Sequence, residues 1–253
     1  MKNSIHVVIF TGGFYPKPWD TESYWNHSLK PDFIIAADSG LDVCLEFKKY
    51  FSGKLDFSPD RILGDFDSVS SKNLLSEFSD DIVRTFSRDK DFTDTELALR
   101  AACCFAKEKK AQPFITLVGG DGGRADHFLN IVDSFRSDFH PDVWLCASQQ
   151  ICCLKKGSEY CLFGLGLDDN VSVANVFGKG NRIETKGFLW ESNLFAKKNM
   201  PSISNRIAPE VLKKGEPVLL KPKAMGFLLI FPLHAILVRN SQDIRNDMNP
   251  EKI

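Results

Sequence analysis

The first 150 residues of the chain alternate short apolar, β-branched runs with segments of helical period. Parallel strands must be joined by crossovers, usually helices, so this alternation is typical of a parallel sheet flanked by helices. We expect strands at residues 5–10, 33–37, 61–63, 82–86, 114–118 and 143–147, and helices at residues 41–50, 71–78, 94–109 and 124–136. The pattern predicts an N-terminal α/β domain, residues 1–148, with a Rossmann-like, mostly parallel sheet.

The sequence changes character after Ser148. Short apolar segments are separated by glycine-rich or charged turns and show no helical period, which is typical of an all-β domain. The expected strands lie at residues 151–154, 159–163, 171–177, 218–221 and 227–231. We therefore expect a C-terminal β-sandwich over residues 149–253.

Composition excludes several classes of protein. The 253 residues include 32 Lys and Arg against 33 Asp and Glu, a formal net charge of −1, so a nucleic-acid partner is not expected. The seven cysteines show no Cys-x-x-Cys spacing, which disfavours zinc and a disulfide framework. Pro232 and His234 interrupt the longest apolar stretch, residues 225–238, so we expect no membrane span. The first apolar run, residues 5–10, ends at a Thr11-Gly12-Gly13 turn, so we expect no signal peptide, and the cysteine pattern fits a reducing cytoplasm.

Carboxylates follow three successive predicted strands. Ligands of open α/β sheets bind at the carboxyl ends of the strands, so these acids should meet at one edge. Each alone is a common turn or cap residue, but two carboxylates about 4 Å apart repel by roughly 4 kcal/mol at an effective dielectric near 20. A cluster made only of oxygen donors favours Mg²⁺ together with substrate phosphates. The acids are Asp38, Asp65, Asp67, Asp89, Asp91 and Asp94.

The fifth predicted strand runs into a glycine-rich segment, residues 119–123, followed by Arg124, Ala125, Asp126 and His127. Helix N-terminal amides and the Arg124 guanidinium could bind an anion, and His127 could bond a phosphate or cap the helix. The alternative is a tight turn. The segment also fits the dinucleotide fingerprint formally, but no acid stands about 20 residues further on, so nicotinamide binding is disfavoured. Asp65 and Asp67 weakly match the nucleophile loop of metal-dependent phosphohydrolases, which normally follows the first strand.

The order of these motifs resembles the thiamine pyrophosphokinase family. The motifs are residues 36–40, residues 64–68, Asp89-x-Asp91-x-Thr93-Asp94, the glycine segment with Arg124, Asp126 and His127, residues 185–190, and residues 203–205. The resemblance implies a homodimer that moves the pyrophosphoryl group of ATP to the hydroxyl of thiamine and releases AMP. It also implies an N-terminal α/β domain that binds ATP and Mg²⁺, and a C-terminal β-sandwich that binds thiamine and forms the dimer.

The resemblance also assigns residues to roles. It implies catalytic roles for Asp65, Asp67, Asp94 and Asp126, magnesium ligation by Asp38, Asp65, Asp67 and Asp91, ATP binding by Asp38, Ser39, Gly40, Asp91, Thr93, Gly122, Gly123 and Arg124, and thiamine binding across the dimer interface by Trp190, Ser204 and Asn205. The sequence does not choose between Asp94 and Asp126 as the acceptor of the hydroxyl proton. Lys90 and Ser39 depart from the glutamine and glycine that many members have at these positions.

Three alternatives stay open at this level. A diphosphokinase for another hydroxymethyl heterocycle, such as a pterin, would share the α/β motifs but would not need Trp190 with Ser204 and Asn205. A metal-dependent phosphohydrolase would release inorganic phosphate. A non-catalytic thiamine- or nucleotide-binding protein would typically lack one of the acids.

Overall fold

The computed structural model describes residues 4–66, 72–87, 91–175, 182–191, 202–223 and 226–240. The chain divides into two compact units, Met1–Cys152 and Cys153–Ile253. Asp67, Asp89 and Lys90, which the sequence analysis singled out, lie outside the described residues.

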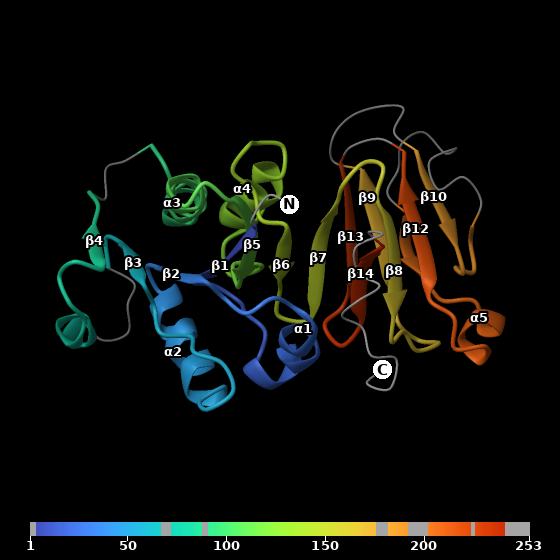
Figure 1. Ribbon diagram of the computed structural model, residues 1–253, viewed down its shortest axis with the longest axis horizontal. Helices are drawn as coiled ribbons and strands as arrows, with labels where there is room; N and C mark the ends of the chain where they lie inside the picture. The colour runs from blue at the N-terminus through green and yellow to red at the C-terminus, as the bar shows by residue number, and fades with distance from the viewer. Residues whose placement is uncertain are drawn as a thin grey trace. The chain divides into compact units, whose positions relative to one another are not determined.

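The N-terminal unit is built on a mostly parallel sheet (Figure 1). Its strands lie side by side in the order β7-β6-β5-β1-β2-β3-β4, and all neighbours are parallel except β6 and β7. The bounds are β1 (Ser4–Thr11), β2 (Phe33–Ala37), β3 (Arg61–Gly64), β4 (Val83–Thr85), β5 (Gln112–Val118), β6 (Val143–Leu145) and β7 (Gln149–Leu154). The strands predicted in this unit are confirmed, with small differences at their ends. β7, which the sequence analysis placed in the second domain, pairs with β6.

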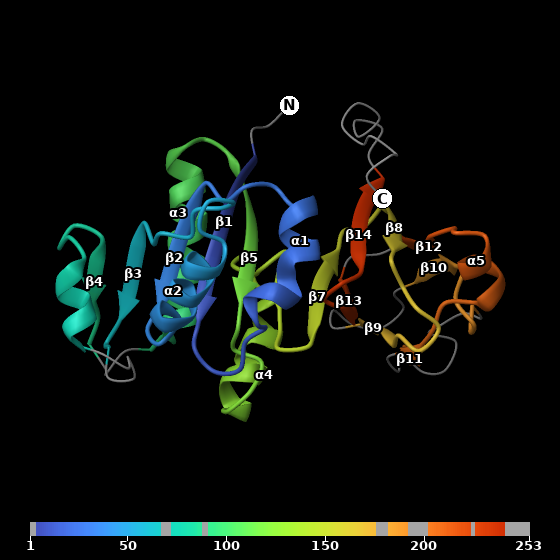
Figure 2. The same ribbon diagram turned by 90° about the horizontal axis from the view of Figure 1, so that it is seen from below.

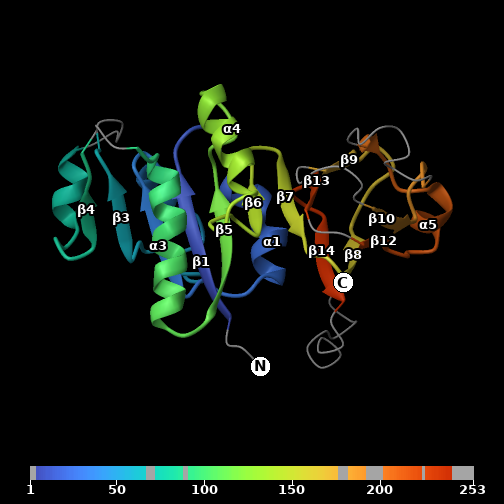
Figure 3. The ribbon, with the colours of Figure 1, turned by 90° about the horizontal axis from the view of Figure 1, so that it is seen from above.

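Helices cover both faces of this sheet. Helices α1 (Glu22–His27) and α2 (Gly40–Tyr50) lie in front of the strands in Figure 2, whereas α3 (Asp94–Glu108) and α4 (Ala125–Ser134) lie in front of them in Figure 3. The sequence Thr93-x-x-Glu96 has the pattern of a capping box, and the structure forms one at the start of α3. The Thr93 hydroxyl accepts from the Glu96 amide, and the Glu96 carboxylate accepts from the Thr93 amide.

One local prediction is corrected. The helix expected at residues 71–78 is a 3₁₀ helix, η2 (Lys72–Glu77), because so short a segment closes with i→i+3 bonds such as Phe78 N–H to the Leu75 oxygen. The 3₁₀ helix η1 (Pro18–Thr21) and α1 were not predicted. Pro18 at the first helical position was the available signal.

Strands β1 and β2 form the centre of the core, and their residues from Val7 to Phe10 and from Phe33 to Ala37 are buried. His6, also in β1, is fully buried and belongs to a hydrogen-bond network of polar groups. Its Nδ1 lies 2.8 Å from the Leu29 oxygen and its Nε2 lies 2.8 Å from Oγ1 of Thr116, which also bonds the Tyr24 hydroxyl at 2.6 Å. Burial lowers the pKa of His6, so the neutral imidazole is the form that fits this chain of bonds.

The C-terminal unit is antiparallel. Its strands form the sets β10-β12-β8-β14 and β11-β9-β13. The bounds are β8 (Glu159–Phe163), β9 (Val171–Asn175), β10 (Ile183–Lys186), β11 (Ser202–Asn205), β12 (Val218–Pro222), β13 (Phe227–Pro232) and β14 (Ile236–Asn240). Strands β10, β11 and β14 were not predicted. The expectation of a unit without helix is wrong, because the unit contains the short helix α5 (Pro209–Lys213). Within the described part of the chain, no helix has the length and apolar character needed to span a membrane.

Candidate active site

A cavity of about 190 Å³ lies at the carboxyl ends of β1, β2 and β5. It brings together the end of β1, the β2–α2 turn, the start of α3 and the glycine segment. Six residues with predicted ligand-binding or catalytic roles line this cavity: Asp38, Ser39, Asp94, Gly122, Gly123 and Arg124. His127 also lines it. Gly40, Asp65, Asp91, Thr93 and Asp126 are described but do not line the cavity.

Close backbone packing builds the wall of this cavity. The start of α2 lies directly on the end of β1, because a β-carbon placed on Gly40 would stand 2.5 Å from the Phe10 carbonyl carbon and 2.6 Å from Cα of Thr11. On the other side of the β1 end, a β-carbon on Gly13 would stand 2.8 Å from the Gly122 oxygen. Only glycine permits these approaches, so the site depends on both positions.

The glycine segment is held by both neighbouring strands. The Gly119 amide donates to the Leu145 oxygen at 3.0 Å, and the Trp144 indole donates to the Gly119 oxygen at 2.7 Å. The Gly120 amide donates to the Phe14 oxygen at 2.8 Å. These bonds fix the loop before any ligand arrives.

Asp121, within the loop, adds a side-chain anchor, since its Oδ2 accepts from the Ala147 amide at 3.0 Å. Burial raises the pKa of this carboxyl group. The roles of Asp121 and Trp144 were not predicted, because neither residue type indicates which distant amide or carbonyl it will contact.

The first two acidic motifs adjoin one another. The Asp38 amide donates to the Leu63 oxygen at 2.7 Å, and a β-carbon on Gly64 would stand 3.0 Å from Cα of Asp38. Asp38 itself has a positive φ of 47°. Non-glycine residues with positive φ are uncommon and cluster at functional sites, where such strain orients a side chain.

The third acidic motif is tied to the cavity through α3. Thr95 Oγ1 lies 2.8 Å from Oγ1 of Thr11 at the end of β1, and the Asn130 side chain of α4 donates to Thr93 Oγ1 at 3.2 Å. These contacts place Asp94, the first residue of α3, at the cavity wall. No three or more His, Cys, Asp or Glu side chains gather into a metal site within the described ranges, which omit Asp67 and Asp89.

Arg124 and Asp126 form an exposed bidentate pair. The Arg124 Nη2 donates to Asp126 Oδ2 at 2.6 Å and its Nε donates to Oδ1 at 3.2 Å, with the side chains 67% and 64% exposed. The hydrogen bonds from Arg124 lower the pKa of Asp126 to about 2. A carboxylate this acidic is a weak base at neutral pH.

The residues predicted to bind thiamine lie together in the C-terminal unit. Trp190 is 53% exposed, Ser204 is exposed with a positive φ of 56°, and Asn205 is 2% exposed. The pairing of β11 with β9 is irregular between Ser202 and Asn205. Irregular pairing of this kind re-aims side chains and is frequent beside functional sites.

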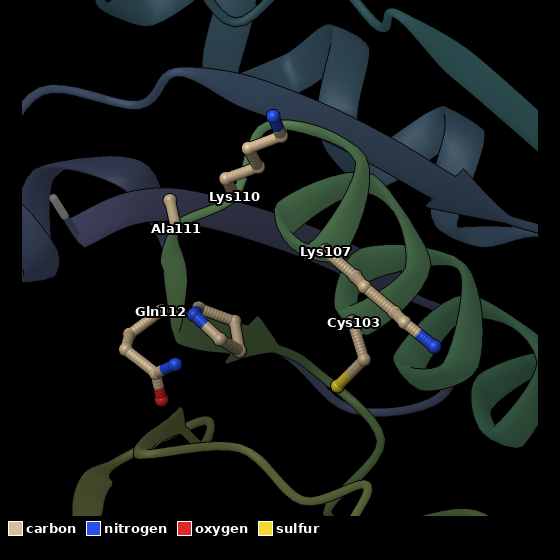
Figure 4. A pocket seen from close by; sticks show the side chains of 6 residues that line it. Cys103, Lys107, Lys110, Ala111 and Gln112 are labelled. Carbon is tan, nitrogen blue, oxygen red and sulfur yellow. The ribbon is translucent and has the colours of Figure 1, made fainter. Parts of the chain in front are cut away.

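A second cavity, about 340 Å³, lies beside the end of α3 and the start of β5 (Figure 4). Its lysines do not converge, since Figure 4 shows the Lys107 and Lys110 side chains pointing in different directions. Burial raises the pKa of the Cys103 thiol there, which disfavours the nucleophilic thiolate. This cavity offers no evident chemistry.

Strand-end acids and an anchored glycine loop at the edge of a parallel sheet define an α/β enzyme that acts on a phosphate-bearing substrate. The family described as "Thiamin pyrophosphokinase, catalytic domain" matches residues 21–145, which cover most of the N-terminal unit. Residues 21–145 therefore form a thiamin pyrophosphokinase catalytic domain, and the chain is an enzyme of thiamine diphosphate synthesis that transfers the pyrophosphoryl group of ATP to thiamine. No curated protein sequence matches the chain.

Solved structures of similar fold carry the same family name. A thiamin pyrophosphokinase family protein from Enterococcus faecalis has a TM-score of 0.62 at 18% identity, covering 90% of this chain and 98% of its own. Thiamine pyrophosphokinase from Bacillus subtilis has a TM-score of 0.59 at 19% identity, covering 91% and 98%. Thiamin pyrophosphokinase from Candida albicans has a TM-score of 0.60 at 16% identity, covering 91% and 93%. At these identities the likeness shows a shared fold.

Proposed function

We propose that pyrophosphoryl transfer from ATP to thiamine takes place at the cavity on the carboxyl edge of the N-terminal sheet. The observation that carries this proposal is that Asp38, Asp94 and the glycine loop with Arg124 line one cavity. These residues come from three separate segments, and together they offer acids for a cation and amides for an anion. A nucleoside triphosphate with its metal needs both.

The triphosphate binds to the glycine loop. Gly122 and Gly123 have no side chains to keep phosphate away from the backbone, and α4 begins directly afterwards at Ala125. Arg124 supplies a planar guanidinium, which Asp126 holds in place by two hydrogen bonds. Ser39 and Gly40 contribute the start of α2 on the opposite side of the β1 end.

The acidic residues fit a magnesium ion. Mg²⁺ usually takes one or two carboxylates, with waters and phosphate oxygens completing its octahedron, so a dense cluster of acids is not required. Asp38 adjoins Gly64, the residue before Asp65, and these oxygen donors suit the ion. The carboxylates that hold the ion would come from among Asp38, Asp65, Asp67 and Asp91, and the bound ion would neutralise charge on the phosphates.

In the reaction, the hydroxyl oxygen of thiamine attacks the β-phosphorus of ATP. The bond between this phosphorus and the oxygen bridging the α- and β-phosphates breaks, and the electron pair leaves with AMP. Asp94 takes the hydroxyl proton, because it lines the cavity, whereas Asp126 does not line it and has a pKa of about 2. The chain's contribution is mainly positioning and charge stabilisation.

Thiamine binds to the C-terminal unit, whose two antiparallel sets form a β-sandwich. Trp190 supplies an exposed indole for the cationic heterocycle, Ser204 supplies a hydroxyl, and Asn205 belongs to the same site. Two chains associate, with thiamine bound at their interface. None of the seven cysteines forms a disulfide, and all lie in the described part of the chain, which supports a cytoplasmic enzyme.

The test is incubation with ATP and Mg²⁺ in the presence of thiamine, of a hydroxymethyl pterin, or of neither. Chromatography should show AMP and thiamine diphosphate in equal amounts in the reaction that contains thiamine, and no AMP in the other two reactions. AMP formation with the pterin would favour the rival diphosphokinase, and inorganic phosphate without an acceptor would favour a phosphohydrolase. Absence of any product, with both ligands shown to bind, would favour a binding protein.

A further inference from the structure

In the segment from Gly187 to Glu191, which carries Trp190, the four backbone amides from Gly187 to Trp190 all donate hydrogen bonds. The Gly187 and Phe188 amides both donate to Oε1 of Glu191, the latter at 3.1 Å. The Leu189 amide donates to the Arg206 oxygen at 2.9 Å. The Trp190 amide donates to Oδ1 of Asn205 at 3.3 Å. The loop is therefore folded by specific partners.

Asn205 contacts the backbone of Trp190 from both sides. Its Oδ1 accepts from the Trp190 amide and also from the Arg206 amide at 3.0 Å, while its Nδ2 donates to the Trp190 oxygen at 3.1 Å. The residue is 2% exposed, so it presents almost no surface to a ligand. The position expected to hydrogen-bond thiamine is thus engaged with the segment that carries the indole.

Arg206, the residue after Asn205, contacts the indole ring of Trp190. The Arg206 guanidinium lies 5.9 Å from the centre of the Trp190 ring, within the range of a cation–π contact. More than half of Trp190 nevertheless stays exposed. An exposed aromatic ring with a fixed backbone loses little conformational entropy when a flat ligand stacks on it.

We propose that Asn205 and Glu191 are positioning residues that act on thiamine through Trp190. Asn205 fixes the Trp190 peptide, and the Glu191 carboxylate closes the preceding turn. This proposal rests on the proposed function, in which Trp190 stacks on thiamine. It assigns Asn205 a role other than direct hydrogen bonding to the substrate and gives Glu191 a role for the first time.

A double-mutant cycle separates the two roles of Asn205. We expect Asn205→Ala to raise the KM for thiamine about tenfold, about 1.4 kcal/mol, with the KM for ATP unchanged. In a Trp190→Ala background the same change should have less than about a twofold effect, because coupled residues are not additive. Should Asn205→Ala fail to fold, Asn205→Asp keeps the Oδ1 acceptor, loses the donor to the Trp190 oxygen and is used in the same cycle.

Two substitutions at Glu191 test its role separately. Glu191→Ala should raise the thiamine KM, whereas Glu191→Gln keeps an oxygen acceptor and should restore it to near the wild-type value. Glu184→Ala is the matched control, because Glu184 is an exposed acid of β10 whose ion pair is with Lys223. It should leave the thiamine KM unchanged.

The possible failures are distinguishable. If Trp190→Ala leaves thiamine kinetics unaltered, the proposed thiamine site is wrong. If Trp190→Ala raises the KM but Asn205→Ala adds the same factor in both backgrounds, Asn205 contacts the substrate directly and the positioning role is overturned. A Glu191→Ala enzyme with the wild-type thiamine KM overturns the role of Glu191.

Discussion

Replacing Gly40 by alanine tests whether the site depends on the close approach of α2 to the end of β1. The new methyl group would stand 2.5 Å from the Phe10 carbonyl carbon and 2.6 Å from Cα of Thr11. Both are backbone atoms in the buried core, so no flexible side chain can move aside. The start of α2 must therefore shift by roughly 1 Å, carrying Asp38 and Ser39 with it.

The size of the effect follows from this shift. Overpacking of a buried site costs about 1–3 kcal/mol of stability. A displacement of about 1 Å in substrate-positioning groups can cost about 100-fold in rate. We therefore expect Gly40→Ala to fold with a lowered Tm and to lose about 100-fold in kcat/KM for ATP.

The assay is AMP release at saturating thiamine, and Gly53→Ala is the matched control. Gly53 lies just beyond the other end of α2, with φ of +81° and no atoms within 4 Å of an added β-carbon. Its replacement should cost about 1 kcal/mol through left-handed strain and leave the kinetics unchanged. A folded Gly40→Ala enzyme with wild-type kcat/KM would refute the proposed site geometry.

Three further predictions address charge and pH. Arg124→Lys should raise the KM for ATP about tenfold, because an ammonium group cannot bond phosphate oxygens with two parallel donors as the planar guanidinium does. An unchanged KM for ATP in steady-state kinetics would show that Arg124 does not bind the phosphates. Asp38→Asn should lower kcat about 100-fold or more and raise the Mg²⁺ concentration for half-maximal activity; a magnesium titration with a wild-type midpoint contradicts this. Because burial lowers the pKa of His6, folding keeps it neutral, so its stabilising contribution is complete above the unfolded value near 6.5 and is lost as pH falls below it. Thermal unfolding between pH 7.5 and 5 should show this loss, and a constant Tm over that range contradicts it.

Local sequence signals predicted the N-terminal unit well. Apolar runs in the sequence predicted the strands from β1 to β6. The pattern Thr93-x-x-Glu96 indicated where α3 starts, because a capping box forms within one turn of helix. Local signals failed where long-range packing decides the structure. β11 and β10 contain polar residues that make poor strand signals, and their strands exist through pairing with β9 and β12.

The candidate site was predictable to a similar extent. Parallel strands bring their carboxyl ends to one edge, so the placing of Asp38 and Asp94 at one cavity followed from chain order. The anchoring bonds of Trp144 and Asp121 did not follow, because each joins residues more than 20 positions apart. Nor could sequence show that Asn205 contacts the Trp190 backbone.

The most direct test of the central claim follows the β-phosphorus of ATP. With ATP labelled at the β-phosphate, pyrophosphoryl transfer to thiamine must place the label in thiamine diphosphate and leave AMP unlabelled. The proposed reaction predicts one labelled thiamine diphosphate for each AMP formed, with no ADP as an intermediate. Label found in ADP or inorganic phosphate, with thiamine unlabelled, would contradict it.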